Sequence, residues 1–142
     1  MSMFWIIVAD SSRARFFATS QKGVPMNELS DMTHIEGRLH ERDEVSDRQG
    51  GIAGGHGEGD HTFEAPTDLK HHEMVVFARQ IADRLETGRV HHDFDKLILV
   101  APPAFLGVLR DTLNDRLRDL VYESLDKHLV TADEATIRNH IF

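Results

Sequence analysis

The stretch "FWIIVADSSRARFFAT", residues 4–19, decides how the chain begins to fold. Its first six residues, Phe4–Ala9, form an apolar run rich in β-formers, which predicts a buried strand. The next four, "DSSR", are typical of a turn, because Asp and Ser side chains bond to their own backbone. Residues 14–19 then resume as a second strand. The stretch therefore predicts two antiparallel strands joined by a short turn.

A third strand is expected after this pair. Residues 27–36 alternate moderately between polar and apolar, with Leu29, Met32 and Ile35 as the apolar positions. Turn residues separate this segment from the second strand. The first quarter of the chain therefore predicts an antiparallel meander.

The clearest helix covers residues 68–87. Thr67 or Asp68 is a suitable N-cap, and Gly88 is a natural C-terminal stop. The side chains that share its apolar face at helical spacing are Met74, Ala78, Ile81 and Leu85. His71 extends this stripe and is expected to cover the edge of the core. The pattern predicts a helix that packs on the sheet.

After this helix, residues 96–101 ("KLILVA") predict a second buried apolar strand. Pro102 and Pro103 end the strand and open a helix, since proline is tolerated in the first helical turn. That helix is expected to break near Asn114 and to restart.

The chain continues with a strand over residues 120–125 and a final helix that ends near Ile141. Thr131 and Glu134 have the spacing of a capping box for that helix. The expected order is βββ-α-β-α-β-α, with the interrupted helix counted once. Right-handed crossovers between parallel strands place helices on both faces of the sheet.

These elements define the expected fold class. It is a single α/β domain over residues 1–142, with three layers and a mixed five-stranded sheet of ribonuclease-H-like type. The expected strand order is 3-2-1-4-5. A long glycine-rich loop joins the third strand to the first helix.

Composition excludes several function classes. The chain has 142 residues, 40% of them hydrophobic, and no cysteine, so disulfides and thiolate chemistry are excluded. Its net charge of −8 argues against a free nucleic-acid duplex as partner, because Lys and Arg drive that binding. The start "MSMFWIIVAD" is too short in its apolar run for a signal peptide or a membrane span. We expect a soluble, cytoplasmic protein without membrane insertion.

The loop is acidic as well as glycine-rich. Periodicity vanishes over residues 37–66, and six of the ten glycines lie between Gly50 and Gly59. Its low hydrophobicity and high charge cannot offset the entropy cost of ordering. We expect the free loop to be disordered and to order on a partner.

Topology places this loop at one edge of the sheet. Residues 10–13, 102–105 and 126–128 should gather there, because they follow strand ends at the same edge. His71 and His72 should lie near them, at the start of the first helix. Ligand sites of open α/β sheets lie at the carboxyl ends of parallel strands. This edge is therefore the expected site.

A two-metal nuclease site is disfavoured. It would need carboxylates within a few ångströms of shared ions. Asp10 is a candidate, but Asp95 begins the strand 96–101 and should lie about 20 Å away, at the opposite edge. Asp10 is better explained as a turn residue.

Nucleotide and metal sites are also disfavoured. The glycines lie well before the helix and among acids, with no Lys in the loop, so they form no phosphate cradle. His56, His61, His71 and His72 are of a metal-ligand type but have no recognised ligand spacing. We expect no metal and no cofactor, and a metal-binding loop is kept as an alternative.

Four segments resemble one family in the right order along the chain. They are "VADSSRARFF" (8–17), "EGRLHERDEVSDRQG" (36–50), "LILVAPPAFLGVLR" (97–110) and "ESLDKHLV" (123–130). They are similar to the bacterial host attachment protein family, described as proteins required for attachment to host cells. The resemblance implies a role in attachment and carries no assigned catalytic residues.

The family is more distantly similar to the central domain of archaeal and eukaryotic peptide release factors. That domain has the same βββ-loop-helix-β order, and its loop carries Gly-Gly-Gln. Here Gly54 and Gly55 are followed by His56, which stands where the Gln would be expected. The resemblance implies a ribosome or a translation factor as partner.

We therefore expect a partner-binding module that uses the loop over residues 38–61 and has no demonstrated enzymatic activity. The alternative is a hydrolase for an ester such as peptidyl-tRNA, with His56 or His40 handling water and Asp10 as a further catalytic candidate. The residues expected to bind the partner are Arg38, His40, Glu41, Arg42, Asp47, Arg48, Gly54, Gly55 and His56.

Overall fold

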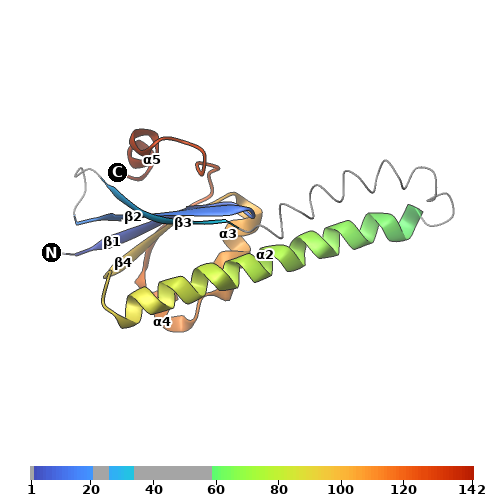
Figure 1. Cartoon of the computed structure of the whole chain (residues 1–142), viewed down its shortest axis with the longest axis horizontal. Helices are drawn as coiled ribbons and strands as arrows, with labels where there is room; N and C mark the ends of the chain where they lie inside the picture. The colour runs from blue at the N-terminus through green and yellow to red at the C-terminus, as the bar shows by residue number, and fades with distance from the viewer. Residues whose placement is uncertain (1, 21–25, 34–58) are drawn as a thin grey trace.

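A computed structural model describes residues 2–20, 26–33 and 59–142, and it has an α/β fold (Figure 1). The elements, in chain order, are β1 (Phe4–Ala9), β2 (Arg13–Thr19), β3 (Asn27–Thr33), α2 (Gly59–Val90), β4 (Lys96–Val100), α3 (Pro103–Thr112), α4 (Asp115–Leu120), β5 (Val121–Leu125) and α5 (Glu134–Ile141).

The described strands form one mixed sheet with the order β3-β2-β1-β4-β5. The sequence predicts the same order, 3-2-1-4-5. β1 pairs antiparallel with β2 and parallel with β4, and β4 pairs parallel with β5. The pair β2 and β3 is antiparallel, with a register shift between Arg15 and Phe17. The prediction of a mixed α/β sheet is confirmed.

β1 lies at the centre of this sheet and is buried at all six positions. Its side chains alternate between two cores, because successive residues of a strand point to opposite faces. Trp5 and Ile7 belong to the core that contains the buried residues of α2, α3 and α4. Ile6 and Val8 belong to the core completed by α5. Figure 1 shows these helices on the two sides of the sheet.

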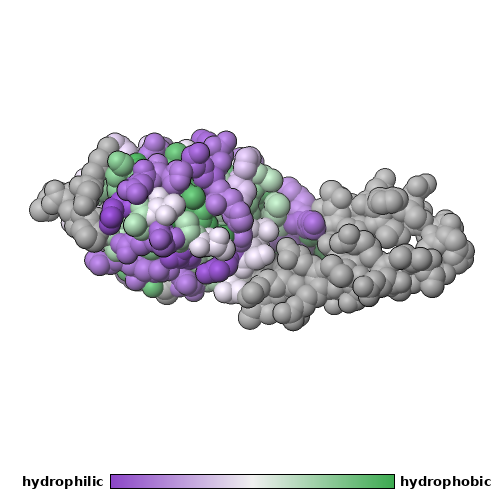
Figure 2. Space-filling model, turned by 90° about the horizontal axis from the view of Figure 1, so that it is seen from above, coloured by the Kyte–Doolittle hydropathy of each residue, from purple (hydrophilic) through white to green (hydrophobic). Residues whose placement is uncertain are grey.

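The α5 side of the molecule is seen in Figure 2. This surface is mostly hydrophilic, and hydrophobic side chains are visible between the polar ones. The half-buried hydrophobic residues that pack on the core beneath it are Leu125, Leu129, Ala132 and Phe142. This side is therefore a covered core and not an open apolar face.

Helix α2 is longer than the sequence indicated. It begins at Gly59, so the expected N-cap at Thr67 or Asp68 was wrong, and Pro66 lies within the helix. The apolar stripe marks only the part of a helix that packs, so it underestimates a helix that extends past its core. Pro66 costs one backbone hydrogen bond without ending the helix.

Gly88 does not end α2 either, because the helix continues to Val90. A Cβ atom added at Gly88 would lie 2.9 Å from ring atoms of both Trp5 and Phe94. Such contacts are too short for a real side chain. Gly88 is therefore required for the close approach of α2 to the sheet and not as a helix stop.

The connection between β3 and α2 was predicted as a loop over residues 37–66. Residues 34–58 lie outside the described part of the chain, so β3 is seen only to Thr33. The last part of the predicted loop, from Gly59 onward, is helical.

Two helix starts in the second half depend on side-chain caps. The expected break near Asn114 is confirmed, because its Oδ1 accepts a hydrogen bond of 2.8 Å from the backbone N–H of Leu117. α5 is capped by Asp133, whose Oδ1 accepts from the N–H of Thr136 at 2.8 Å. The prediction of a capping box that starts at Thr131 was wrong, because the N-cap is Asp133, which directly precedes the first helical residue.

Candidate functional site

The carboxyl ends of the parallel strands β1, β4 and β5 meet at one edge of the sheet. Ala101, after β4, donates its backbone N–H to the carbonyl of Leu125 at 3.1 Å and so joins two strand ends. Asp10 follows β1, and His128 lies three residues after β5. Their side chains approach to 3.4 Å between Asp10 Oδ2 and His128 Nε2. The predicted gathering of residues 10–13 and 126–128 is confirmed by this contact.

Asp10 uses its two carboxylate oxygens differently. Oδ1 accepts hydrogen bonds from the backbone N–H groups of Ser12, at 2.8 Å, and Arg13, at 2.9 Å. The backbone N–H of Asp10 donates to the carbonyl of Arg13 at 2.9 Å. The interpretation of Asp10 as a turn residue is therefore correct. Its second oxygen, Oδ2, remains directed at His128.

His128 is held at this edge by the segment that follows it. Val130 is fully buried in the core on the α5 side. Arg15 of β2 donates from Nη1 to the carbonyls of Val130, at 3.1 Å, and Ala132, at 2.6 Å. The segment is thus held by the buried side chain of Val130 and by the hydrogen bonds that Arg15 donates to two of its carbonyl groups.

Arg15 is itself fixed by a two-point ion pair with Glu28 of β3. Nε and Nη2 of Arg15 lie 3.0 and 3.1 Å from the two carboxylate oxygens of Glu28. This hydrogen bonding raises the pKa of Arg15 and lowers the pKa of Glu28. Burial, followed by the neighbouring Glu28, raises the pKa of Asp31. β2, β3 and the segment after β5 therefore meet at one charged cluster.

The pair of Asp10 and His128 is accessible to other molecules. The exposed fraction is 59% for the His128 side chain and 25% for that of Asp10. A carboxylate beside an imidazole fixes the orientation and tautomer of the ring. No hydroxyl group hydrogen-bonds to His128 within the described residues. The pair can bind polar groups and can move a proton.

Asp95 lies at the opposite, amino edge of the sheet. Its Oδ2 accepts from the backbone N–H of Met3 at 2.8 Å, and its own N–H donates to the carbonyl of Met3 at 2.8 Å. Asp10 and Asp95 are thus separated along the sheet, as expected. No group of three metal-ligating side chains occurs in residues 2–20, 26–33 and 59–142.

The predicted loop residues cannot be placed at this site. Arg38, His40, Glu41, Arg42, Asp47, Arg48, Gly54, Gly55 and His56 all lie outside the described residues. His71 and His72 are described, and both are exposed on α2. The prediction that His71 covers the core edge was wrong, because the His71 side chain is exposed.

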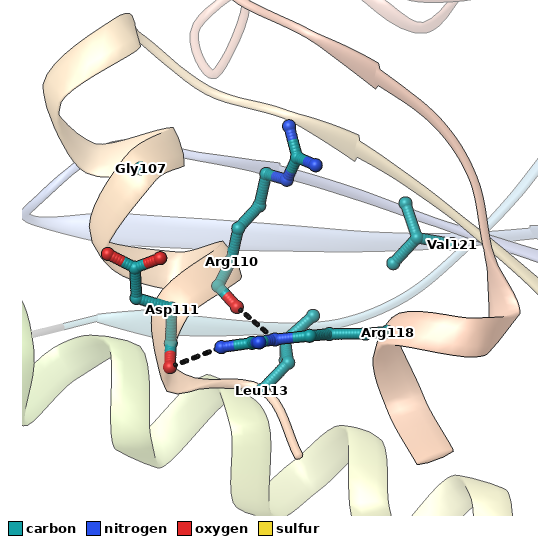
Figure 3. A pocket seen from close by; sticks show the side chains of 6 residues that line it. All are labelled: Gly107, Arg110, Asp111, Leu113, Arg118 and Val121. Carbon is teal, nitrogen blue, oxygen red and sulfur yellow. Dashed lines mark hydrogen bonds between the residues drawn. The ribbon is translucent and has the colours of Figure 1, made fainter. Parts of the chain in front are cut away.

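A small hollow of about 280 Å³ lies between α3 and the start of β5 (Figure 3). Arg118 of α4 crosses it and donates to the backbone carbonyls of Arg110, at 3.0 Å, and Asp111, at 2.9 Å. The last carbonyls of a helix have no partners within the helix, so Arg118 supplies them for α3. In Figure 3 the side chain of Arg110 points away from Arg118. Arg118 is therefore a structural cap.

Sequence reasoning missed Arg15 and the partner of Asp10. Arg15 stands in a strand pattern beside Phe16 and Phe17, and its carbonyl partners lie more than a hundred residues away, so no local spacing indicates its role. His128 was placed at the correct edge by the strand order, but it was not named as a candidate.

Comparison with known proteins identifies one family. A family model described as "Protein required for attachment to host cells" matches residues 5–141. No curated protein matches the chain. None of the helices in the described ranges is long and apolar enough to cross a membrane. The matched range includes both Asp10 and His128.

Proposed function

The chain belongs to the family of proteins required for attachment to host cells, and from that premise we propose that it is a partner-binding module. Its contact surface is the carboxyl edge of the sheet. The observation that carries the proposal is the approach of Asp10 Oδ2 to His128 Nε2 at 3.4 Å. The family gives the general role, which is attachment.

Three properties of this pair support binding. The two side chains come from opposite ends of the sequence, and both are accessible to a partner. The pair offers a carboxylate acceptor and a ring nitrogen 3.4 Å apart. The backbone around each residue is held by hydrogen bonds, so little conformational freedom is lost when a partner binds.

We propose a ribosome or a translation factor as the partner, with the chain acting in the cytoplasm and affecting attachment indirectly. The support is the sequence resemblance to release-factor central domains and the strand order of the mixed sheet. On this basis the fold is a single domain of ribonuclease-H-like type. The predicted contact segment, residues 38–61, would add further contacts with the partner; its last three residues are helical in α2.

The test is a pull-down from lysate with three forms of the chain. The double variant Asp10→Asn with His128→Gln removes the polar pair. The variant Asp95→Asn makes the same change in charge at the opposite edge and serves as the matched control. We expect the unaltered chain and the control to capture the same partner and the double variant to lose it. Equal capture by all three would exclude the carboxyl edge as the contact surface.

The identity of the partner needs a separate measurement. Lysate is fractionated at low salt, and the chain is followed in ribosomal fractions across growth phases. Co-sedimentation that is lost in the double variant supports the ribosome. If the chain stays outside those fractions in every growth phase, the ribosome is excluded as the partner. The pull-down would then identify a different partner.

Ester hydrolysis is a second candidate, favoured by the same pair. Asp10 would hold the imidazole of His128 while a ring nitrogen accepts a proton from water. The water oxygen would then form a bond to the ester carbonyl carbon, and the departing alkoxide would take up that proton. The purified chain is assayed on a peptidyl ester. Activity lost in His128→Gln and retained in Asp95→Asn supports this candidate, and activity equal to buffer rejects it.

A further inference from the structure

A groove of about 790 Å³ lies between β3 and the second half of α2. Its volume is in the range of small-molecule sites. Trp5, Leu29 and Met32 of the sheet supply apolar walls, and α2 and the turn after it supply Asp83, Arg84 and Asp93. The groove shares no residue with the pair of Asp10 and His128.

Arg84 is the unusual group in this groove. Its guanidinium carbon lies 4.8 Å from the ring centroid of Phe16 and 5.7 Å from that of Trp5. Its Nε atom is buried and has no hydrogen-bond partner. Within the described ranges no carboxylate pairs with it, although Arg15 and Arg89 each pair with a glutamate.

An unpaired buried donor is energetically unfavourable. Leaving such a group without a hydrogen bond costs about 1–3 kcal/mol, and more when the group is charged. Stacking on two aromatic rings offsets part of that cost through cation–π attraction. An anion in the groove would offset more of the cost by pairing with the charge of the guanidinium, whose fork matches a carboxylate in geometry.

We propose that this groove binds a small carboxylic acid with an apolar body. The carboxylate pairs with Arg84, and the apolar body lies against Trp5, Leu29 and Met32. Leu29 is 40% exposed, so its side chain is available for this contact. Asp83 and Asp93 also line the groove, and their charges favour a monoanion over a phosphate dianion, since like charges repel.

Trp5 is the single tryptophan of the chain, so its fluorescence reports directly on the groove. The probes are phenylbutyrate, its neutral amide phenylbutyramide, and phenyl phosphate. We expect phenylbutyrate to change the Trp5 emission in a saturable way. The amide and the phosphate should bind at least about tenfold more weakly, which corresponds to one lost charge-assisted interaction.

Two variants and one control variant test the residues of the groove. Arg84→Met keeps the apolar stem and removes the charge, so it should abolish the preference for the acid over the amide. Arg110→Met is the matched control, because it removes an arginine from a different hollow (Figure 3) and should leave the preference unchanged. Leu29→Glu, at an exposed position, should weaken the acid more than the amide, and it tests the site even if Arg84→Met does not fold.

Three results would overturn the proposal. The first is equal binding of acid and amide by the unaltered chain. The second is an unchanged preference in both Arg84→Met and Leu29→Glu. The third is the lack of any saturable change in Trp5 emission with phenylbutyrate up to millimolar concentration.

Discussion

The two edges of the sheet each carry an aspartate at a strand terminus, and the two residues have different partners. At the amino edge, Asp95 bonds to the backbone of Met3, just before the neighbouring strand. At the carboxyl edge, Asp10 bonds to its own turn through one oxygen and faces His128 through the other. The same residue type thus closes one edge and presents a polar side-chain pair at the other.

The two edges also differ in what holds them together. The amino edge is filled by aromatic rings, with Trp5 and Phe94 at a centroid distance of 4.9 Å beneath Gly88. The carboxyl edge is held by hydrogen bonds from Arg15 to carbonyl groups and leaves His128 accessible. Parallel strands therefore provide two edges, of which one is fixed by packing and the other is available for contacts.

The largest expected effect on stability is at Arg15, which holds the segment after β5 at the carboxyl edge. Arg15→Met leaves the carbonyls of Val130 and Ala132 without this donor and removes the pair with Glu28. We expect a loss of about 3 kcal/mol in the free energy of unfolding. Chemical denaturation measures it. Arg89→Met, which removes a partly exposed pair with Glu86 on one helix, is the control and should have little effect. Similar losses in both variants would contradict the role given to Arg15.

The second effect is at the amino edge. Gly88→Ala pushes a methyl group against Trp5 and Phe94, and we expect a loss of about 2 kcal/mol in the free energy of unfolding. Gly107→Ala is the matched control, because an added Cβ there has no heavy atom within 4 Å. That change should stabilise α3 by about 0.5–1 kcal/mol through helix propensity. If both substitutions stabilise the chain, the amino edge is not closely packed.

The third prediction separates stability from binding. Asp10→Ala and Asp95→Ala each remove hydrogen bonds to backbone N–H groups, so each should cost about 1 kcal/mol in thermal or chemical unfolding. Only Asp10→Ala should also lose the captured partner, because only Asp10 faces His128. Loss of capture in both variants would indicate that lowered stability, and not the polar pair, explains the result.

The two smallest effects concern the dependence of stability on pH, at Glu28 and at Asp31. The pKa of Glu28 lies below its ordinary value of 4.5, so the stabilisation by its charge is complete above that value. It is lost as the pH falls through the lower pKa of the folded state. Glu28 is partly exposed, so Glu28→Gln should cost only about 0.5 kcal/mol at neutral pH. The variant and the unaltered chain should converge in denaturation once the pH falls below the lowered pKa of Glu28.

The charge of Asp31, in the same cluster, has the opposite effect on the free energy of unfolding. Its pKa is raised by burial and by Glu28, so its charge opposes folding at neutral pH. Asp31→Asn should therefore be neutral or slightly stabilising there, with a difference that shrinks as the pH falls below the raised pKa. A destabilised Asp31→Asn variant at neutral pH would contradict this electrostatic account.

Local patterns predicted the sheet well. Phe4–Ala9 was recognised as a strand at its observed bounds, because a short apolar run between turn residues has few other solutions. The directions of the parallel strands are sufficient to predict that Asp10 and residues 126–128 lie at one edge of the sheet. Asp10 was also assigned correctly to the turn, since that depends only on adjacent residues.

Other features could not be predicted, because they depend on distant partners. The pairing of Asp10 with His128 spans 118 positions in sequence. Gly88 appeared as a helix stop, although its role is to make room for the rings of Trp5 and Phe94. The start of α2 was missed because the apolar stripe ends where the helix leaves the sheet.

The length of α2 has a mechanical consequence. Its 32 residues span about 48 Å, whereas strands of five to seven residues span about 17–24 Å. In Figure 1 the first half of the helix extends beyond the sheet. Such a helix acts as a lever whose fulcrum is the packed half around Phe77 and Ile81. A tilt of about 5° there would move Gly59 by about 2 Å over an arm of about 25 Å. A small change in how the packed half sits on the sheet is therefore enlarged at the start of α2.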